Sequence, residues 1–241
     1  MADLINGYFF NKLYKKMEDL KTYLENYNAE YGNFKKFTEA GSYTFVVPMG
    51  VEKVYVSGIG GGGGGASGAG SSSSTYQGGG GGSGGKGSTV IDQEIIVSEG
   101  EELTISVGDG GAQTATPSSV SSNGIDGNNG ENTIVYKGGI AVLTALAGTG
   151  GKKGGYGSDS DGSGGAGGTL DGGAGANGAF DGQAAGGECG LTVFGNYGKG
   201  CNGGTGGLRG YDWHNPGAGE KGNQGAVVIC FGAKRFADVS W

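Results

Sequence analysis

Several kinds of residue are scarce in this chain of 241 residues, and each scarcity excludes a class of protein. There are three prolines, one histidine and three cysteines, and only 16% of the residues are charged. Collagen needs far more proline than this, and a metal site cannot be built around a single histidine. No apolar run approaches the ~20 residues that span a membrane. We therefore expect no collagen helix, no metal centre and no membrane insertion.

Basic residues are also too few for a nucleic-acid-binding protein. The formal net charge is −7, and no cluster of lysine and arginine offsets it. In the N-terminal segment the charges follow the apolar residues, the reverse of a secretory signal. Cys189, Cys201 and Cys230 are odd in number and lack metal-ligand spacing. We expect them to be small buried residues of a protein made in a reducing cytoplasm.

Motifs that suggest catalysis or cofactor binding are incomplete. Gly58–Gly63 fits a dinucleotide-binding pattern, but the helix that this pattern requires cannot form in the ASGAGSSSS that follows. Asp159–Gly162 lacks the further oxygen ligands of a calcium loop, which favours a solvated turn. No motif pairs a serine or cysteine nucleophile with His214. The sequence therefore predicts a protein that is not an enzyme and holds no cofactor.

Glycine is abundant instead. All but four of the 62 glycines lie between Gly58 and Gly232. Each ordered glycine loses more backbone entropy than any other residue, and ordering them all costs on the order of 100 kcal/mol. Either the region is disordered, or closely approaching glycine backbones form a hydrogen-bond lattice that offsets the cost.

The N-terminal part has a helical pattern. Residues 8–31 contain no glycine or proline, and Gly32 is a natural stop. Apolar residues follow a heptad spacing at Phe10, Leu13, Met17, Leu20, Leu24, Tyr27, Tyr31 and Phe34. We expect a parallel coiled coil, and the bulky aromatic residues of the seam suggest three strands. The alternative is an amphipathic helix packed on its own chain.

Short β-type segments follow. SYTFVV (42–47), VEKVYVSGI (51–59), TVIDQEIIV (89–97), ELTISV (102–107), NTIVY (132–136), IAVLTAL (140–146) and AVVICF (226–231) are rich in β-branched or aromatic residues. Most are bounded by glycine, asparagine or serine, as in an antiparallel β-sandwich. Because the last segment returns after a long glycine-rich stretch, that stretch is not expected to be wholly disordered.

The glycine-rich sequence forms two blocks, residues 58–88 and 147–225. In the second block glycines recur every third residue, for example at 148, 151, 154 and 157. Three residues per turn is the repeat of a polyproline-II-type helix. Short triplet runs that turn back on themselves predict a polyglycine-II bundle. A flexible linker is the alternative, and it stays open with equal weight for residues 58–88.

Aromatic residues suggest where such a bundle would bind a partner. Tyr211, Trp213, His214 and Asn215 are crowded into one predicted loop, and Tyr197 and Tyr156 are weaker candidates of the same kind. Tyrosine and tryptophan offer large contact areas at small entropy cost. The alternative is that these rings cap the glycine lattice or pack on the β domain.

The order of the motifs resembles the glycine-rich domain of phage and prophage tail-fibre proteins. GSYTFVVPMGVEKVYVSGIGGGGGG, EGEELTISVGDGGA, GIAVLTALAGTGGKKGG and GNQGAVVICF follow one another as in that family, over residues 37–232. The resemblance implies a polyglycine-II bundle whose end loops, around residues 156–163, 196–197 and 211–215, contact a host receptor. This chain departs from the family in carrying its own helical seam, which favours a homotrimer.

Together these inferences predict a mainly β fibre. Residues 1–36 form a coiled-coil stalk that attaches to another virion protein, and residues 37–146 form a β-sandwich with the insertion 58–88. Residues 147–225 form the tip, and residues 226–241 form a closing strand and tail. The expected function is adhesion of a virion tail fibre, assembled in the host cytoplasm, to a bacterial surface glycan or outer protein. A purely structural fibre, as a capsid decoration or an extracellular scaffold, is the alternative.

Overall fold

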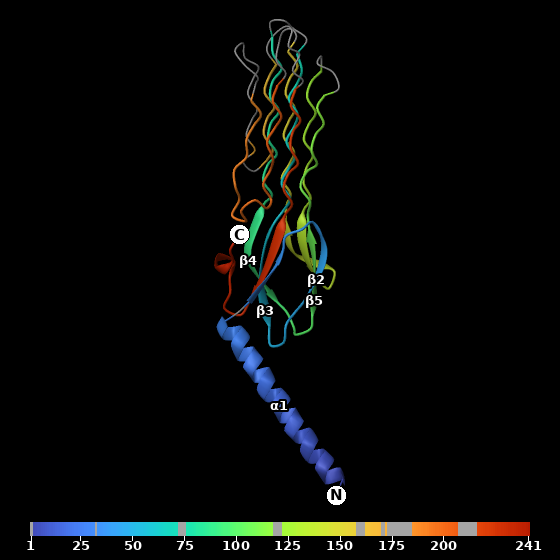
Figure 1. Cartoon of the computed structure of the whole chain (residues 1–241), viewed down its shortest axis with the longest axis vertical. Coiled ribbons are helices and arrows are strands. Elements are labelled where there is room, and N and C mark those ends of the chain that lie inside the picture. Colours follow the sequence, from blue (N-terminus) through green and yellow to red (C-terminus); the bar gives the residue numbers. More distant parts are fainter. Residues whose placement is uncertain are drawn as a thin grey trace.

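The structure is a computed structural model of the whole chain, and it describes residues 2–31, 33–71, 76–117, 122–157, 162–169, 172, 185–206 and 216–241. The molecule is elongated (Figure 1): a helix lies at one end, a β domain in the middle, and a bundle of extended glycine-rich runs at the other end. No helix in the described parts of the chain has the length and apolar character needed to cross a membrane.

The N-terminal helix α1 spans Ala2–Tyr31. Strand β1 (Asn33–Phe37) begins directly after Gly32, so Phe34, which the heptad pattern assigns to the helical seam, lies in a strand. All five residues of β1 pair with β8. The helical part therefore ends at Tyr31, five residues before the expected boundary at residue 36, because the residues from Asn33 pair with β8 instead.

Two antiparallel sheets form the β domain. One has the strand order β1-β8-β3-β4 and the other β2-β5-β6-β7. The remaining strands are β2 (Gly41–Val46), β3 (Lys53–Ile59), β4 (Thr89–Ile96), β5 (Glu102–Val107), β6 (Thr133–Lys137), β7 (Ile140–Ala145) and β8 (Ala226–Phe231). The seven predicted β segments are therefore all strands, with bounds that agree within about two residues.

One apolar core joins the two sheets. It includes Val56 and Ile229 from one sheet and Leu103, Ile105 and Val135 from the other, all of them fully buried. These side chains lie at alternate positions of their strands, which places them on one face of each sheet. The fold thus buries its few large apolar residues between the two layers.

Strand β8 is buried on both faces. Val227 and Ile229 face the common core, whereas Val228 and Cys230 face a second apolar cluster built around Phe194. A strand buried on both sides reads as a continuous apolar run, as AVVICF does. Residues 191–198 and the C-terminal segment, which includes the short helix Phe236–Asp238, cover this outer face.

The glycine-rich bundle is ordered around a central run, residues 60–70. The N–H groups of this run donate in turn to the carbonyl oxygens of three antiparallel runs. Residues 61, 64, 67 and 70 donate to residues 131, 128, 125 and 122 of the first run, and residues 62, 65 and 68 donate to residues 223, 220 and 217 of the second. Residues 63, 66 and 69 donate to residues 85, 82 and 79 of the third. A donor that changes partner at each residue and returns every third residue is the pattern expected for polyglycine-II helices.

Three further runs, which lie parallel to the central run, donate to its carbonyl oxygens. Gly148, Gly151, Gly154 and Gly157 donate from one, Cys201 and Gly204 from another, and Gly111 and the Thr114 hydroxyl from the third. The central run therefore has bonded neighbours on all sides. Residues 77–88 form a second interior run, which donates to residues 146–155 and 198–204 and accepts from residues 162–168 and from Gly187.

Burial follows the same three-residue repeat. Every residue from 56 to 71 and from 77 to 85 is buried. Residues 72–75, between these two stretches, lie outside the described part of the chain. In the outer run 108–117, Gly111, Thr114 and Pro117 are buried while the residues between them are exposed. The linker alternative for residues 58–88 is therefore wrong for the described residues. Residues 108–117 and 122–132, for which no lattice was predicted, are two of its outer runs.

Candidate functional site

The end of the lattice opposite the helix is the first candidate for a binding site, because the glycine-rich runs extend side by side from the β domain toward it (Figure 1). Gly157 N–H donates to the carbonyl oxygen of Gly70, and Gly162 N–H donates to that of Gln77 at 2.7 Å. Gly217 N–H donates to the carbonyl oxygen of Thr205, also at 2.7 Å. Segments far apart in the sequence are therefore held side by side at this end.

Of the predicted receptor-contacting residues, Tyr211, Trp213, His214 and Asn215 lie outside the described residues. Their flanking residues are described: Thr205 and Gly217 belong to neighbouring lattice runs that are hydrogen-bonded to each other. The structure therefore holds the described residues on either side of this predicted loop next to each other.

Tyr156 lies at the distal end of the run 146–157 and is half-buried. A ladder of side chains holds this run: the carboxamide or carboxylate oxygens of residues 123, 126, 129 and 132 accept the N–H groups of residues 156, 153, 150 and 147 at 2.8–2.9 Å. Each rung replaces a backbone carbonyl by an Asn or Asp side chain. The backbone of Tyr156 is thus fixed by the last rung, Asn123.

Tyr197 lies elsewhere, in the turn 191–198 against the β domain. Its ring meets that of Trp241 edge-on, with centroids 5.9 Å apart, and its carbonyl oxygen accepts the Thr192 hydroxyl at 2.7 Å. The ring of Trp241 also lies 4.6 Å from that of Phe194. The structure therefore separates Tyr197 from Tyr156 and uses it in the cluster that covers β8.

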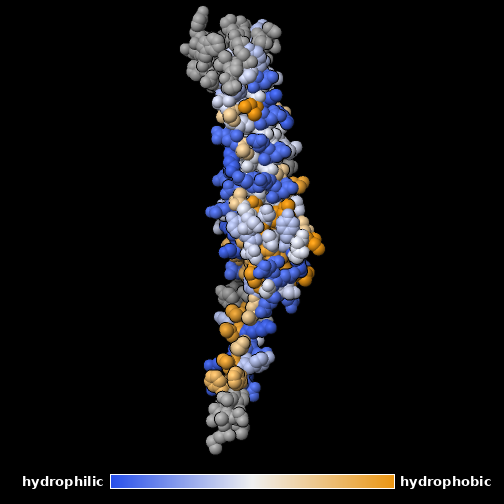
Figure 2. Space-filling view, turned by 90° about the vertical axis from the view of Figure 1, so that its right-hand side faces the viewer, coloured by the Kyte–Doolittle hydropathy of each residue, from blue (hydrophilic) through white to orange (hydrophobic). Residues whose placement is uncertain are grey.

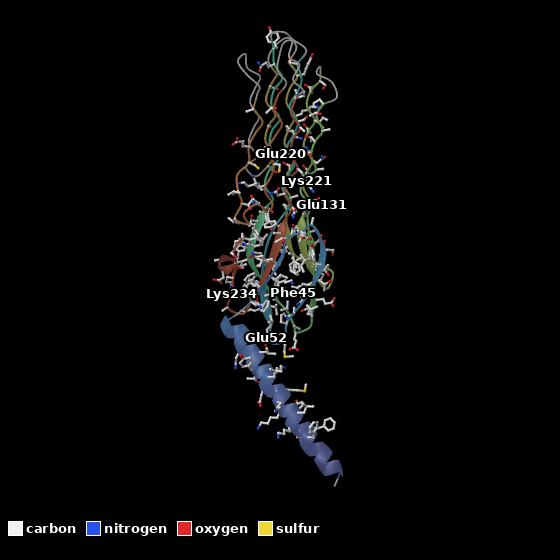
Figure 3. The ribbon with its side chains drawn as sticks, in the orientation of Figure 1. Phe45, Glu52, Glu131, Glu220, Lys221 and Lys234 are labelled. Carbon is white, nitrogen blue, oxygen red and sulfur yellow. The ribbon has the colours of Figure 1, made fainter. Side chains whose placement is uncertain are left out.

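Ion pairs bridge neighbouring lattice runs on the surface. Lys221 Nζ lies 2.7 Å from the Asp109 carboxylate, and Lys152 Nζ lies 3.1 Å from that of Asp126. The hydrogen bond from Lys221 lowers the pKa of Asp109, and the backbone N–H of Lys153 lowers the pKa of Asp126. Figure 3 shows Lys221 and Glu131 near the base of the lattice. The two ion pairs thus link neighbouring runs of the lattice.

Two features of the described residues bear on metal binding and on thiol chemistry. They contain no group of three or more histidine, cysteine, aspartate or glutamate side chains that could hold a metal ion. The three cysteines are free thiols, and burial raises the pKa of Cys201 and of Cys230 to about 11. Such thiols are protonated near neutral pH and are poor nucleophiles.

The helix is the second candidate site. Its seam residues Phe10, Met17 and Leu20 are 58–67% exposed and Leu13 is 47% exposed, so these side chains are not packed on their own chain. Leu24 is half-buried, and the side chains of Tyr27 and Tyr31 lie outside the description. Figure 2 shows hydrophobic residues along the helix. The sequence predicted this apolar face, and the structure leaves it open to a partner.

Comparison with known proteins gives a family but no named relative. No curated protein matches the chain. The model of a family described as a glycine-rich domain matches residues 38–234, which include strands β2 to β8 and all the lattice runs. This is most of the chain, and it agrees with the region over which the sequence motifs suggest a glycine-rich domain. The chain belongs to this glycine-rich domain family.

Proposed function

We propose that the protein is a short fibre of a phage or phage-like particle, and that the distal end of its glycine lattice binds the host bacterial surface. The observation that carries the proposal is the polarity of the molecule. A helix with a series of exposed apolar side chains lies at one end, and a lattice of hydrogen-bonded runs lies at the other (Figure 1). This arrangement suits a particle that is held at one end and makes contact at the other.

The binding mechanism follows from rigidity. A polyglycine-II lattice holds the ends of the loops in place, so little conformational entropy is lost when a partner binds. Tyr211, Trp213, His214 and Asn215 are the proposed contact residues, together with Tyr156, whose backbone N–H donates to Asn123. The proposed partner is a surface glycan or an outer protein of the bacterium.

The helix serves attachment in this proposal. Three copies would form a parallel coiled coil through Phe10, Leu13, Met17, Leu20 and Leu24, and the N-terminal end would contact another virion protein. Hydrophobic residues at alternating three- and four-residue spacing pack into such a seam. A trimer presents three tips, and simultaneous binding of linked sites raises the overall affinity.

A purely structural glycine-rich fibre is the alternative, and the position of Tyr197 favours it. The fold uses this candidate ring for internal packing against Trp241 rather than for display at the distal end. A lattice whose backbone groups bond to one another can also act as a stiff spacer without any ligand.

Binding of the purified full chain to host cells tests the adhesin. Tyr211→Ala combined with Trp213→Ala is expected to abolish binding, with the unfolding temperature unchanged. The control is Leu191→Ala combined with Val193→Ala, which removes two exposed apolar side chains near the β domain. Equal binding by both double variants would refute the assignment of the tip. Immunogold microscopy with antibody to residues 147–225 then separates the two functions: gold on distal fibre ends supports the adhesin, and gold on capsids supports the structural fibre.

A further inference from the structure

The helix is joined to the β domain through the backbone of one strand. Its described side chains from residue 9 to residue 23 are exposed, and β1 follows the helix after the single residue Gly32. The glycine lattice extends from the opposite end of the β domain (Figure 1). A pull that separates the two ends of the molecule therefore enters the β domain at Asn33, the first residue of β1.

The pairing of β1 with β8 sets how this pull acts on the two strands. Asn33 lies opposite Phe231, at the end of β8, and Phe37 lies opposite Val227, near its beginning. β8 continues directly from the lattice, because the hydrogen-bonded lattice residue Gly225 precedes it. The helix and the lattice are thus attached to opposite ends of the pair.

This arrangement is the stronger of the two ways in which paired strands can be pulled apart. Strands pulled from opposite ends slide along each other, and all the hydrogen bonds between them are strained together. Strands pulled from the same end separate one pair of residues at a time. For a pull between the helix and the lattice, β1 and β8 have the first geometry.

Strand β3 keeps β8 in place during such a pull. It pairs with β8 along its length, and its last residue, Ile59, lies opposite Ala226, the first residue of β8. Both strands therefore join the lattice at the same end, and β8 is buried on both faces. β1 is an edge strand with β8 as its neighbour in the sheet, so β1 is the strand that would move.

The path beyond β1 is weaker. Residues 38–40 connect β1 to β2, whose first residue, Gly41, lies opposite Val107 at the lattice end of the other sheet. Once β1 has left β8, the pull reaches β2 at this end and separates it from β5 one pair at a time, beginning at Gly41. The β1–β8 pair is thus the main resistance between the helix and the interior of the β domain.

Side-chain contacts strengthen the pair. Gln224 Nε2 donates to the Thr38 carbonyl oxygen at 3.0 Å, which joins the residue after β1 to the segment before β8. Lys36 donates to the carbonyl oxygen of Ser240, and its Nζ lies 4.7 Å from the centre of the Trp241 ring. These contacts must also break before β1 can slide along β8.

We propose that the β1–β8 pair is a mechanical joint, by which the protein carries tension from its helix to its lattice without unfolding. The inference rests on the proposed function in one respect: such tension arises when a particle is held at the helix and a cell is bound at the lattice tip. Resistance of this kind is set by the rate of unfolding under force rather than by the equilibrium free energy.

Single-molecule force spectroscopy on the full chain tests the joint by pulling it in two directions. In the first, handles on the N-terminus and on an azide-bearing residue in place of Ala115, an exposed lattice residue, shear the pair. In the second, handles on the two ends of the chain, beyond Asn33 and Phe231, open the pair from one end. Because antiparallel bonds are then strained singly or in twos, we expect β1 to leave β8 at a force at least about twofold lower in the second direction.

Two lysines of β1 provide a matched pair of variants. Lys36→Met removes the bond to Ser240 and keeps the length of the side chain, whereas Lys35 is exposed. Hydrogen bonds from charged groups are the stronger ones. Lys36→Met is therefore expected to raise the rupture rate at constant force in the first direction about fivefold or more, and Lys35→Met to leave it unchanged.

The outcomes separate the joint from the proposed adhesin. Equal rupture forces in the two directions, or a first released segment other than residues 33–40, would overturn the joint. Equal rupture rates for Lys36→Met and Lys35→Met would remove Lys36 from it. A chain that resists shear as expected but does not bind host cells leaves the joint standing and refutes the adhesin, and binding without a difference between the two directions does the reverse.

Discussion

A single methyl group added to the central glycine run provides the sharpest test of the lattice. Gly65 N–H donates to the Glu220 carbonyl at 3.0 Å, and its own carbonyl accepts the Thr114 hydroxyl at 3.1 Å. In Gly65→Ala, the new Cβ would overlap the carbonyl oxygen of Asn202 on the neighbouring run, far inside the 3.0 Å below which real Cβ contacts essentially never occur. The run 199–206 must therefore move outward.

The cost follows from the bonds that this displacement breaks. Cys201 and Gly204 donate from the displaced run to the central run, and Asn202 accepts the N–H of Glu220. At about 1 kcal/mol net for each bond, three lost bonds destabilise the fold by about 3 kcal/mol. Alanine also lowers the backbone entropy of the unfolded chain relative to glycine, which offsets about 0.4–1 kcal/mol of this destabilisation. A net loss of about 2–3 kcal/mol is a large part of the ~5–15 kcal/mol that holds a domain folded.

Urea unfolding measures this loss, and Gly190→Ala is the matched control. Gly190 lies on an outer run, and a Cβ there would approach nothing closer than the Lys86 Nζ, at 3.5 Å. The control is expected to remain within about 0.5 kcal/mol of wild type. Buried Ala66 shows that the lattice accepts a methyl group where a space exists, so the comparison is specific to position. If Gly65→Ala and Gly190→Ala unfold alike, the close packing around Gly65 is refuted.

Four further predictions concern other contacts. Thr114→Val should lower the free energy of unfolding in urea by about 2 kcal/mol or more, because the Gly65 carbonyl and the Gly219 N–H lose their partner, whereas Thr114→Ser should be close to wild type. The pKa of Asp126 is lower in the folded than in the unfolded state. Its contribution to the free energy of unfolding is therefore fully present above the unfolded pKa of about 4 and is lost as the pH falls through the folded pKa. The unfolding temperature of Asp126→Asn should accordingly depend less on pH below about 4 than that of wild type. With a pKa of about 11, Cys201 should react with a thiol reagent at pH 7 at least about a hundredfold more slowly in the folded than in the unfolded protein, and equal rates would refute its burial. Leu13→Lys with Leu20→Lys should lower the sedimenting mass while β-domain unfolding stays unchanged, and an unaltered mass would argue against the helical seam.

The β domain was largely predictable because its strands carry strong local patterns. ELTISV and AVVICF have the predicted bounds, since each is a dense apolar or alternating run between breakers. β1 was missed for a physical reason. It is an edge strand with Lys35 and Lys36 in its middle, and edge strands commonly carry lysine in place of an apolar alternation. Phe34 also fits the heptad spacing, so the sequence pattern assigned it to the helix rather than to a strand.

The candidate site was predictable in part. Tyr156 lies at the distal end of its run, and its role in binding stays a prediction. Tyr197, a candidate of the same kind in the sequence, packs against Trp241. The two differ in their partners: Asn123 accepts from the backbone of Tyr156, whereas the carbonyl of Tyr197 closes a tight turn with Thr192. These contacts join residues that local pattern analysis treats separately, except for the regular spacing of Asn123, Asp126, Asn129 and Asn132.

The density of glycine indicates where a run lies in the lattice. A three-residue helix with neighbours on every side faces a backbone at each residue, so side chains rarely fit, and the central run 60–70 consists almost wholly of glycine and alanine. A run on the surface meets neighbours with one residue in three, and glycine then recurs at 124, 127 and 130 with larger residues between: Ile125, Asp126, Asn128 and Asn129. Unbroken glycine, which in isolation suggests a flexible linker, therefore marks the interior when triplet runs accompany it. The linker alternative does not hold for the described residues of 58–88, because outer runs from other parts of the chain surround this block and bond to it.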